Sequence, residues 1–252
     1  MLLSTTCKNK IAKIYKKPNI KSELTSQMLF GEKFIIKKKI KNFYKGFSSY
    51  DRYPGYVLIN DFLEDKKEKN YRVKIKKAFL YTNASNNKIL KKKLLFNSKV
   101  SILEHKNTFV KIGSCWIKKK SISKIFYKSN NYLKNISFFL GTRYLWGGNS
   151  IEGIDCSGLV QQLMKSINSK CPRDSKDQLV FFKKKISLSE IKKGDLIFWK
   201  GHVAIALNKK LLVHAYSPKK KVLIMPIFKT IHLLEIKKLK VLSIRRPNGI
   251  PS

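Results

Sequence analysis

Short apolar runs separated by turn residues fill the first half of the chain. Between residues 8 and 64 the turns fall at Pro18-Asn19, Gly31-Glu32 and Pro54-Gly55, and the apolar runs are IAKIY, KFIIKKKI, FYKGFSSY and GYVLI. Several short strands at this spacing predict a small β-barrel. Residues 70–124 repeat the design more weakly, with VKIKKAFLYTNAS, KKKLLFNSKVSILE and FVKIGSCWIKK, and predict a second, degenerate barrel.

The pattern changes at about residue 136. The segment NISFFLGTRYLWGG predicts a helix ended by Gly147-Gly148, and a second helix follows Asp155, with apolar residues at helical spacing. The later runs LIFWK, HVAIAL, KLLVHAYS and VLIMPI predict strands. Helices followed by antiparallel strands indicate an α+β domain over residues 136–246. The charged segment 65–70 is a linker, and residues 125–135 bridge to this last domain.

Composition indicates a globular protein, because 43% of the residues are hydrophobic and 12% aromatic. The 55 Lys and Arg residues against 15 Asp and Glu give a net charge of +40. Two explanations stay open: an anionic partner, or a compositional bias toward Lys, Asn and Ile that loads solvated surfaces with lysine. Neither arginines placed for base reading nor aromatic platforms in a basic groove are visible, so we expect no specific nucleic-acid partner.

The four cysteines, Cys7, Cys115, Cys156 and Cys171, have no short metal-type spacing and predict free thiols. We therefore expect no metal and no cofactor. The first residues, MLLSTTCKNK, hold too short an apolar stretch for a secretory signal, and no segment approaches a membrane span. A monomer in the bacterial cytoplasm is expected, or one in the periplasm or cell envelope if the natural start lies upstream.

Three local patterns in the last domain carry candidate chemistry. Asp155-Cys156-Ser157-Gly158 begins the second predicted helix, and His202 and His214 lie on two consecutive predicted strands. A cysteine in the first turn of a helix lies at the positive end of the helix dipole, which stabilises a thiolate and predicts a lowered pKa for Cys156. A hairpin through Asn208–Lys210 would place the two imidazoles side by side, where one serves as base and the other orients it.

Six motifs in order then carry a resemblance. YLWGG, GIDCSGLV, PRDSKDQ, KKGDLIFW, GHVAIAL and VHAYS cover nearly all of residues 136–246 and are similar to the NlpC/P60 family of papain-related cysteine peptidases. The resemblance implies a papain-like domain, with helices packed on an antiparallel sheet, after two SH3-like barrels. It implies that Cys156 is the nucleophile, His202 the base and His214 its orienting residue. It also implies that Tyr144 helps to hold the oxyanion.

The same resemblance implies a substrate. Family γ-D-glutamyl-L-diamino-acid endopeptidases recognise the free amine of an N-terminal L-Ala, and Asp155 and Ser175 match that pocket. Asp155 has the further role of helix cap, and Ser175 has the alternative of an N-cap or turn residue. Relatives with two barrels take another acid from the first barrel, which we expect within residues 50–56. The barrels serve either in targeting and substrate restriction or as plain scaffold.

Two further side chains have open alternatives. Arg173 either faces carboxylates of the peptidoglycan stem or is solvated, and Trp199 either shapes the cleft or packs in the core.

We expect hydrolysis of a γ-D-Glu to diaminopimelate or Lys amide bond in peptidoglycan stem peptides or muropeptides. Two other functions stay open. One is a basic wall-polymer or nucleic-acid binding protein with a secondary or inactive catalytic domain. The other is a thiol amidase or acyltransferase, because acyl-enzyme chemistry is shared by these classes.

Overall fold

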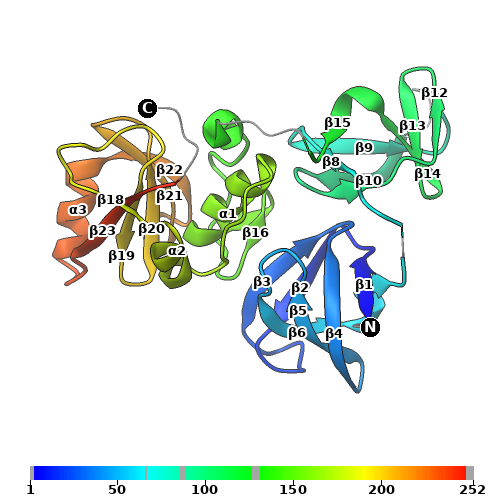
Figure 1. The fold of residues 1–252 in the computed structure, drawn as a ribbon, viewed down its shortest axis with the longest axis horizontal. Coiled ribbons are helices and arrows are strands. Elements are labelled where there is room, and N and C mark those ends of the chain that lie inside the picture. The colour runs from blue at the N-terminus through cyan, green and yellow to red at the C-terminus, as the bar shows by residue number, and fades with distance from the viewer. Residues whose placement is uncertain (1–2, 66, 86–88, 127–130, 248–252) are drawn as a thin grey trace. The chain divides into compact units, whose positions relative to one another are not determined.

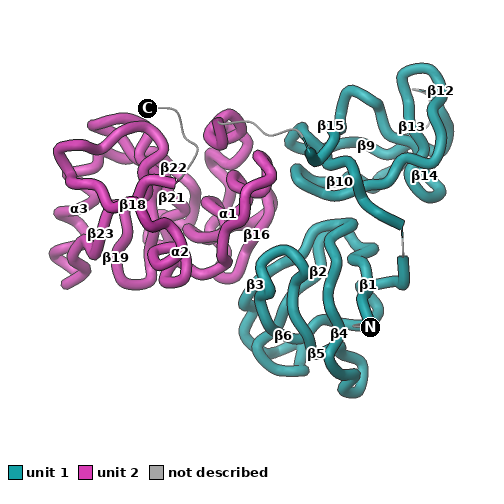
Figure 2. The backbone as a smooth tube through the Cα atoms, in the orientation of Figure 1, with its two compact units in different colours: residues 1–128 teal, residues 129–252 magenta. Residues whose placement is uncertain are grey.

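A computed structural model describes residues 3–65, 67–85, 89–126 and 131–247 of the chain. The chain forms two compact units, residues 1–128 and residues 129–252 (Figure 2). Residue 66 of the predicted linker 65–70, and residues 127–130 of the predicted bridge 125–135, lie outside the described residues.

The first part of unit 1 is a seven-stranded antiparallel sheet with strand order β3-β2-β6-β5-β4-β1-β7 (Figure 1). Its strands are β1 (Ser4–Cys7), β2 (Ile11–Tyr15), β3 (Leu24–Leu29), β4 (Lys33–Ile40), β5 (Phe43–Ser48), β6 (Pro54–Leu58) and β7 (Phe62–Leu63). One face buries a core that includes Ile14, Phe34 and Val57. The predicted apolar runs of this region therefore do form strands.

One predicted turn in this sheet is wrong. Pro54 and Gly55 do not turn the chain but belong to β6, where they pair with Phe47 and Gly46 of β5. The chain reverses instead over residues 49–53. Proline is tolerated at the first position of a strand, so its presence alone does not mark the turn.

The second part of unit 1 consists of two small antiparallel sheets, ordered β10-β9-β14-β13-β12 and β11-β8-β15. Their strands are β8 (Tyr71–Val73), β9 (Lys77–Tyr81), β10 (Ile89–Leu95), β11 (Lys99–Val100), β12 (Glu104–Lys106), β13 (Phe109–Ile112), β14 (Cys115–Lys118) and β15 (Ile122–Lys124). Both sheets contribute to one apolar core, which includes Val73, Val110 and Ile117.

Unit 2 is built on a six-stranded antiparallel sheet of order β18-β23-β19-β20-β21-β22 and on a two-stranded β16-β17 pair (Figure 1). The strands are β16 (Asn149–Ser150), β17 (Gly153–Ile154), β18 (Lys184–Ile186), β19 (Leu196–Trp199), β20 (His202–Ala206), β21 (Leu211–Tyr216), β22 (Lys221–Pro226) and β23 (Val241–Arg246). All four apolar runs predicted as strands are strands.

The α-helices of unit 2 are α1 (Cys156–Ser166), α2 (Ser175–Phe181) and α3 (Ile227–Glu235). α1 contacts β20 and β21, and α3 contacts β22. Within the described ranges, none of the helices has both the length and the apolar character needed to cross a bilayer.

The helix predicted over residues 135–148 is wrong. A 3-10 helix (Tyr132–Phe138) ends there, and the following backbone pairs with distant segments. Tyr144 donates its amide hydrogen to the carbonyl of Lys220, and Leu145 donates to that of Ile154. Gly141 has φ +76°, outside the helical region, so no helix continues through this segment.

The core of the first sheet gives a stability prediction. Phe34 is fully buried and packs its ring 6.0 Å from that of Phe62, so Phe34→Ala should lower the local free energy of unfolding by about 3–5 kcal/mol. The matched change Leu63→Ala, at a side chain that is 41% exposed, should cost far less. Hydrogen exchange of β4 and β5 amides measures both. Equal exchange in the two variants would contradict this packing.

Candidate active site

Cys156 is the first residue of α1 and lies beside the start of β20. Asp155 is the N-cap, with extended backbone angles, and its Oδ1 accepts the amide hydrogen of Gly158 at 2.7 Å. The predicted cap is therefore confirmed. The sulfur of Cys156 lies 4.0 Å from the carbonyl oxygen of Gly201, and the amides of Ser157 and Val203 hydrogen-bond to it. The helix tip thus meets the backbone on both sides of His202.

The electrostatics of this thiol differ from the sequence expectation. Burial, together with a smaller contribution from the nearby charge of Asp155, raises the pKa of Cys156 to about 12. The two amide hydrogen bonds and the charge of Arg173 oppose the shift without reversing it. Helix-dipole reasoning predicted a lowered pKa, and it failed because it left out desolvation of a side chain that is only 7% exposed. The thiol is therefore neutral near pH 7.

His202 and His214 lie on neighbouring strands joined by a tight turn. Asn208 closes the turn by accepting the amide hydrogens of Lys210 and Leu211, both at 2.8 Å. The strands pair Ile205 with Val213, which puts the two histidines on the same face of the sheet. His202 Nε2 lies 3.0 Å from His214 Nδ1.

Burial keeps both imidazoles neutral. It lowers the pKa of His202 to about 4. It also lowers the pKa of His214 to about 3, with a further contribution from the charge of His202. His214 has no exposed surface, and His202 is partly exposed. Among the residues that the structure describes, no group of three or more His, Cys, Asp or Glu side chains is placed to hold a metal ion.

Arg173 is buried against Asp155, which corrects both of its predicted alternatives. Its side chain is 2% exposed, and its guanidinium binds both carboxylate oxygens of Asp155, at 2.9 and 2.5 Å. It also donates to Ser157 Oγ and to the carbonyl of Gly148. Arg173 is therefore neither solvated nor open to a stem-peptide carboxylate, because Asp155 occupies its hydrogen-bonding edge.

Asp155 connects three segments of the site. Besides the cap and Arg173, its Oδ2 accepts the amide hydrogen of Gly147 at 3.0 Å, and its Oδ1 accepts from Ser157 Oγ. Gly158 is required in this packing, since an added Cβ there would lie 2.5 Å from the carbonyl oxygen of Gly148. These contacts use most of the accepting capacity of the Asp155 carboxylate, and its predicted role in binding a substrate amine stays a prediction.

The backbone of Tyr144 forms an isolated parallel β-bridge with the backbone of Ile154. Its side chain is half-buried, and burial raises the pKa of its hydroxyl well above the ordinary value. The charges of Cys156 and Asp155 add to the shift, which places the hydroxyl within their electrostatic reach. The hydroxyl therefore stays protonated and able to donate a hydrogen bond.

Ser175 and Trp199, the two remaining predicted site residues, differ in how far they are exposed. Ser175 is the first residue of α2 and partly exposed, while the N-cap is Asp174, so the N-cap alternative for Ser175 is wrong. Trp199 is 1% exposed and belongs to the core cluster, with its ring 5.6 Å from that of His202. Trp199 therefore fits the core alternative rather than the cleft alternative, because it offers no surface to a substrate.

Sequence reasoning missed one residue that holds the first turn of α1 in place. Gln178 of α2 has no exposed surface, and its amide donates to the carbonyls of Ser157 and Pro172, both at 2.9 Å. The only signal was its place at the end of the PRDSKDQ motif. Gln178 ties α2 to the first turn of α1.

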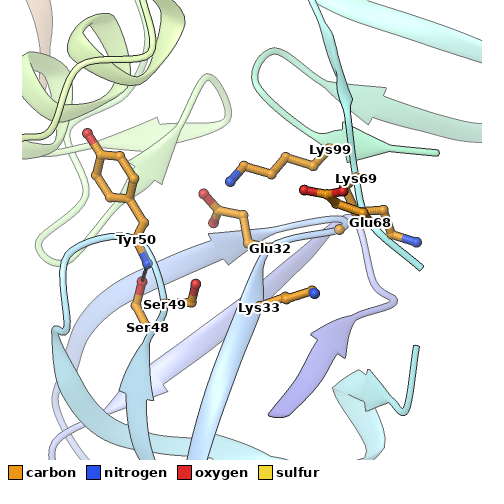
Figure 3. Close-up of a pocket in the computed structure, with 9 residues that line it drawn as sticks. Glu32, Lys33, Ser48, Ser49, Tyr50, Glu68, Lys69 and Lys99 are labelled. Carbon is orange, nitrogen blue, oxygen red and sulfur yellow. Dashed lines mark hydrogen bonds between the residues drawn. The ribbon is translucent and has the colours of Figure 1, made fainter. Parts of the chain in front are cut away.

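Unit 1 contains a polar pocket of about 200 Å³. In Figure 3 the carboxylate of Glu32 and the ammonium of Lys99 point into the same space, with the ring of Tyr50 across from them. Glu32 also accepts the amide hydrogen of Leu29 at 2.8 Å. Gly31 has φ +80°, and an added Cβ would lie 1.9 Å from the carbonyl oxygen of Lys99, so only glycine fits there.

The acid expected within residues 50–56 stays a prediction. The acid in that segment, Asp51, accepts the amide hydrogen of Tyr53 at 3.1 Å and stabilises the turn. Glu68 lines the pocket with Tyr50, and so does Glu32. The place of Glu32 in the sequence, directly after Gly31, indicated a turn residue.

The Asp155–Arg173 pair gives the second prediction. Arg173→Met should leave the buried carboxylate of Asp155 without its cationic partner and lower the free energy of unfolding by about 3–5 kcal/mol. The double variant Asp155→Asn with Arg173→Met should recover part of the loss, because no charge is then left unpaired. Urea unfolding of the full chain measures all three proteins. A single variant as stable as the wild type would contradict the role given to this pair.

Two family models match parts of this chain. The NlpC/P60 family model matches residues 141–235, and the model of the bacterial dipeptidyl-peptidase SH3 domain matches residues 14–62. The chain is 28% identical to dipeptidyl-peptidase 6 of Lysinibacillus sphaericus, over 81% of this chain and 84% of the relative. It is 27% identical to a γ-D-glutamyl-L-lysine dipeptidyl-peptidase of Bacillus subtilis, over 84% and 79%.

A solved structure gives the same fold. An NlpC/P60 family protein from Bacillus cereus superposes with a TM-score of 0.83 at 20% identity, over 99% of this chain and 100% of that chain. The chain therefore carries an NlpC/P60 domain over residues 141–235 and, ahead of it, a bacterial SH3 domain over residues 14–62.

Proposed function

We propose that this protein is a cysteine peptidase that hydrolyses the amide bond between γ-D-Glu and a diamino acid in peptidoglycan-derived peptides. Cys156 acts as nucleophile, His202 as base and His214 as the residue that orients it. The observation that carries the proposal is the helix tip at Cys156 beside the His202 backbone, with His214 Nδ1 at 3.0 Å from His202 Nε2. The substrate class is supported by the dipeptidyl-peptidase names of the relatives.

The finer architecture belongs to the same proposal. We infer a papain-like arrangement, in which helices pack on the antiparallel sheet and present the nucleophile to a histidine on a strand. The contacts of α1 with β20 and β21 support it.

The chemistry follows from two neutral partners. As the sulfur of Cys156 attacks the carbonyl carbon, its proton passes to His202, a C–S bond forms and the carbonyl electron pair moves to oxygen. The protonated hydroxyl of Tyr144 donates a hydrogen bond to that oxyanion. When the intermediate collapses, the C–N bond breaks and His202 returns its proton to the leaving amine. Water then attacks the thioester with His202 as base, which releases the acid product and restores the thiol.

Asp155 and Ser175 complete the proposal as residues that contact the substrate. Ser175 is partly exposed at the start of α2, and the Asp155 carboxylate lies directly before the nucleophile. The amine of an N-terminal L-Ala would be recognised there by charge and hydrogen bonding.

The nucleophile is tested by substitution. Cys156→Ala should abolish release of the dipeptide from L-Ala-γ-D-Glu-diaminopimelate, measured by mass spectrometry, because no thiol is left to form the thioester. The control Cys171→Ala changes another buried cysteine of the same unit and should retain activity. Undiminished cleavage by Cys156→Ala, or no cleavage by the wild type, would remove the proposal.

The pH profile tests the state of the base. A base is active while it is deprotonated, and burial lowers the pKa of His202 to about 4. The acid limb of kcat/KM should therefore fall clearly below pH 6.5, about the value of an unperturbed histidine. Steady-state kinetics across acidic buffers measure it. An acid limb at or above the ordinary histidine value would show that the imidazole is not desolvated.

A further inference from the structure

His214 lies between the base and a sulfur atom. Its Nδ1 is 3.0 Å from His202 Nε2, and its Nε2 is 3.3 Å from Met225 Sδ. His214 has no exposed surface, and Met225 is 8% exposed. The β21–β22 register pairs His214 with Leu223 and Leu212 with Met225, so Met225 is a diagonal neighbour of His214 on the same face. The three side chains form a row: Met225, His214 and His202.

The sulfur restricts where the protons of this row can lie. A thioether has lone pairs and no hydrogen, so it can only accept a hydrogen bond. Neutral His214 has one N–H. That hydrogen is more stable on Nε2, because there it can be donated to the sulfur of Met225. The Nδ1 atom of His214 is then an acceptor, and it takes the hydrogen from Nε2 of His202. The remaining nitrogen of His202, Nδ1, is left with a free lone pair.

The opposite arrangement cannot support the proposed chemistry. With its hydrogen on Nδ1, His214 would donate to His202 Nε2, and the hydrogen of neutral His202 would have to lie on Nδ1. The nitrogen left for the thiol of Cys156 could then accept no proton. The Nε2 lone pair of His214 would also face the lone pairs of Met225 in a buried place, without a hydrogen bond.

We propose that Met225 is a positioning residue of the catalytic centre, whose sulfur selects the tautomer of His214 and through it the tautomer of His202. The tautomer assignment stands on the geometry of the three side chains, and its effect on catalysis rests on the function proposed above. Met225 touches no substrate in this role and acts only through His214.

Side chains other than Met225 also hold the ring of His214 in place. The hydrogen bond to the Met225 sulfur can therefore be removed without losing the packing of the ring. Tyr216 stacks on it with ring centroids 4.6 Å apart and an interplanar angle of 8°. Trp199, His202 and Met225 lie on the same side of the sheet, within or beside the apolar cluster. A leucine at 225 would fill the space of the methionine and keep the ring in place, while it removes the acceptor.

The first measurement is the tautomer itself. Long-range ¹H–¹⁵N NMR of the full chain labelled at histidine nitrogens, at neutral pH, should find the hydrogen on Nε2 in both His202 and His214. Met225→Leu should turn His214 into a mixture of tautomers. The matched control Met164→Leu, at a buried methionine of α1, should leave both signals unchanged. A hydrogen on Nδ1 of His202 in the wild type, or unchanged tautomers in Met225→Leu, would overturn the proposal.

The second measurement is kinetic. Met225→Leu should lower kcat by roughly three- to tenfold, the size expected for one weak hydrogen bond, with KM nearly unchanged because no substrate contact is lost. Selenomethionine in place of methionine keeps an acceptor and should keep kcat. A rise in KM with constant kcat would contradict a positioning role. If the wild type cleaves no peptide, the proposed function fails, and the NMR result still decides the tautomer.

Discussion

The buried pair of Asp155 and Arg173 is the interaction on which the rest of the site depends. The carboxylate of Asp155 caps α1 and accepts the amide hydrogen of Gly147. It also neutralises the guanidinium of Arg173, which is almost fully shielded from solvent. A buried charge without its partner is costly, so these groups are stable only together. Because Cys156 directly follows Asp155, the pair fixes the position of the sulfur relative to β20.

Desolvation, more than the helix dipole, sets the charge state of the proposed catalytic groups. The same burial that surrounds Cys156 and the two histidines penalises both the thiolate and the imidazolium, and it favours a neutral thiol beside neutral imidazoles. In such a site, the proposed catalysis depends on which nitrogen of each histidine carries the lone pair, and it needs no permanent ion pair between thiolate and imidazolium. The row from Met225 through His214 to His202 accounts for that direction.

Local patterns predicted most of the sheet and the contents of the site, while pairings between distant segments escaped them. The apolar runs became strands, and Asn208 closes the predicted hairpin, because alternation and turn chemistry act over a few residues. The segment around Tyr144 has apolar spacing typical of a helix, but its backbone bonds to Lys220 and Ile154. The pairing of Arg173 with Asp155 and that of His214 with Met225 could not be predicted from the sequence for the same reason, because both depend on strand register and burial.

In the proposed mechanism the sulfur of Cys156 forms the covalent intermediate. The direct measurement is peptide mapping after treatment with L-alanyl-γ-D-glutamyl diazomethyl ketone, which alkylates a thiol placed to attack the γ-carbonyl carbon. We expect one modified residue, Cys156, with Cys7, Cys115 and Cys171 unlabelled. Label on another cysteine, or continued turnover of substrate with Cys156 fully alkylated, would contradict it.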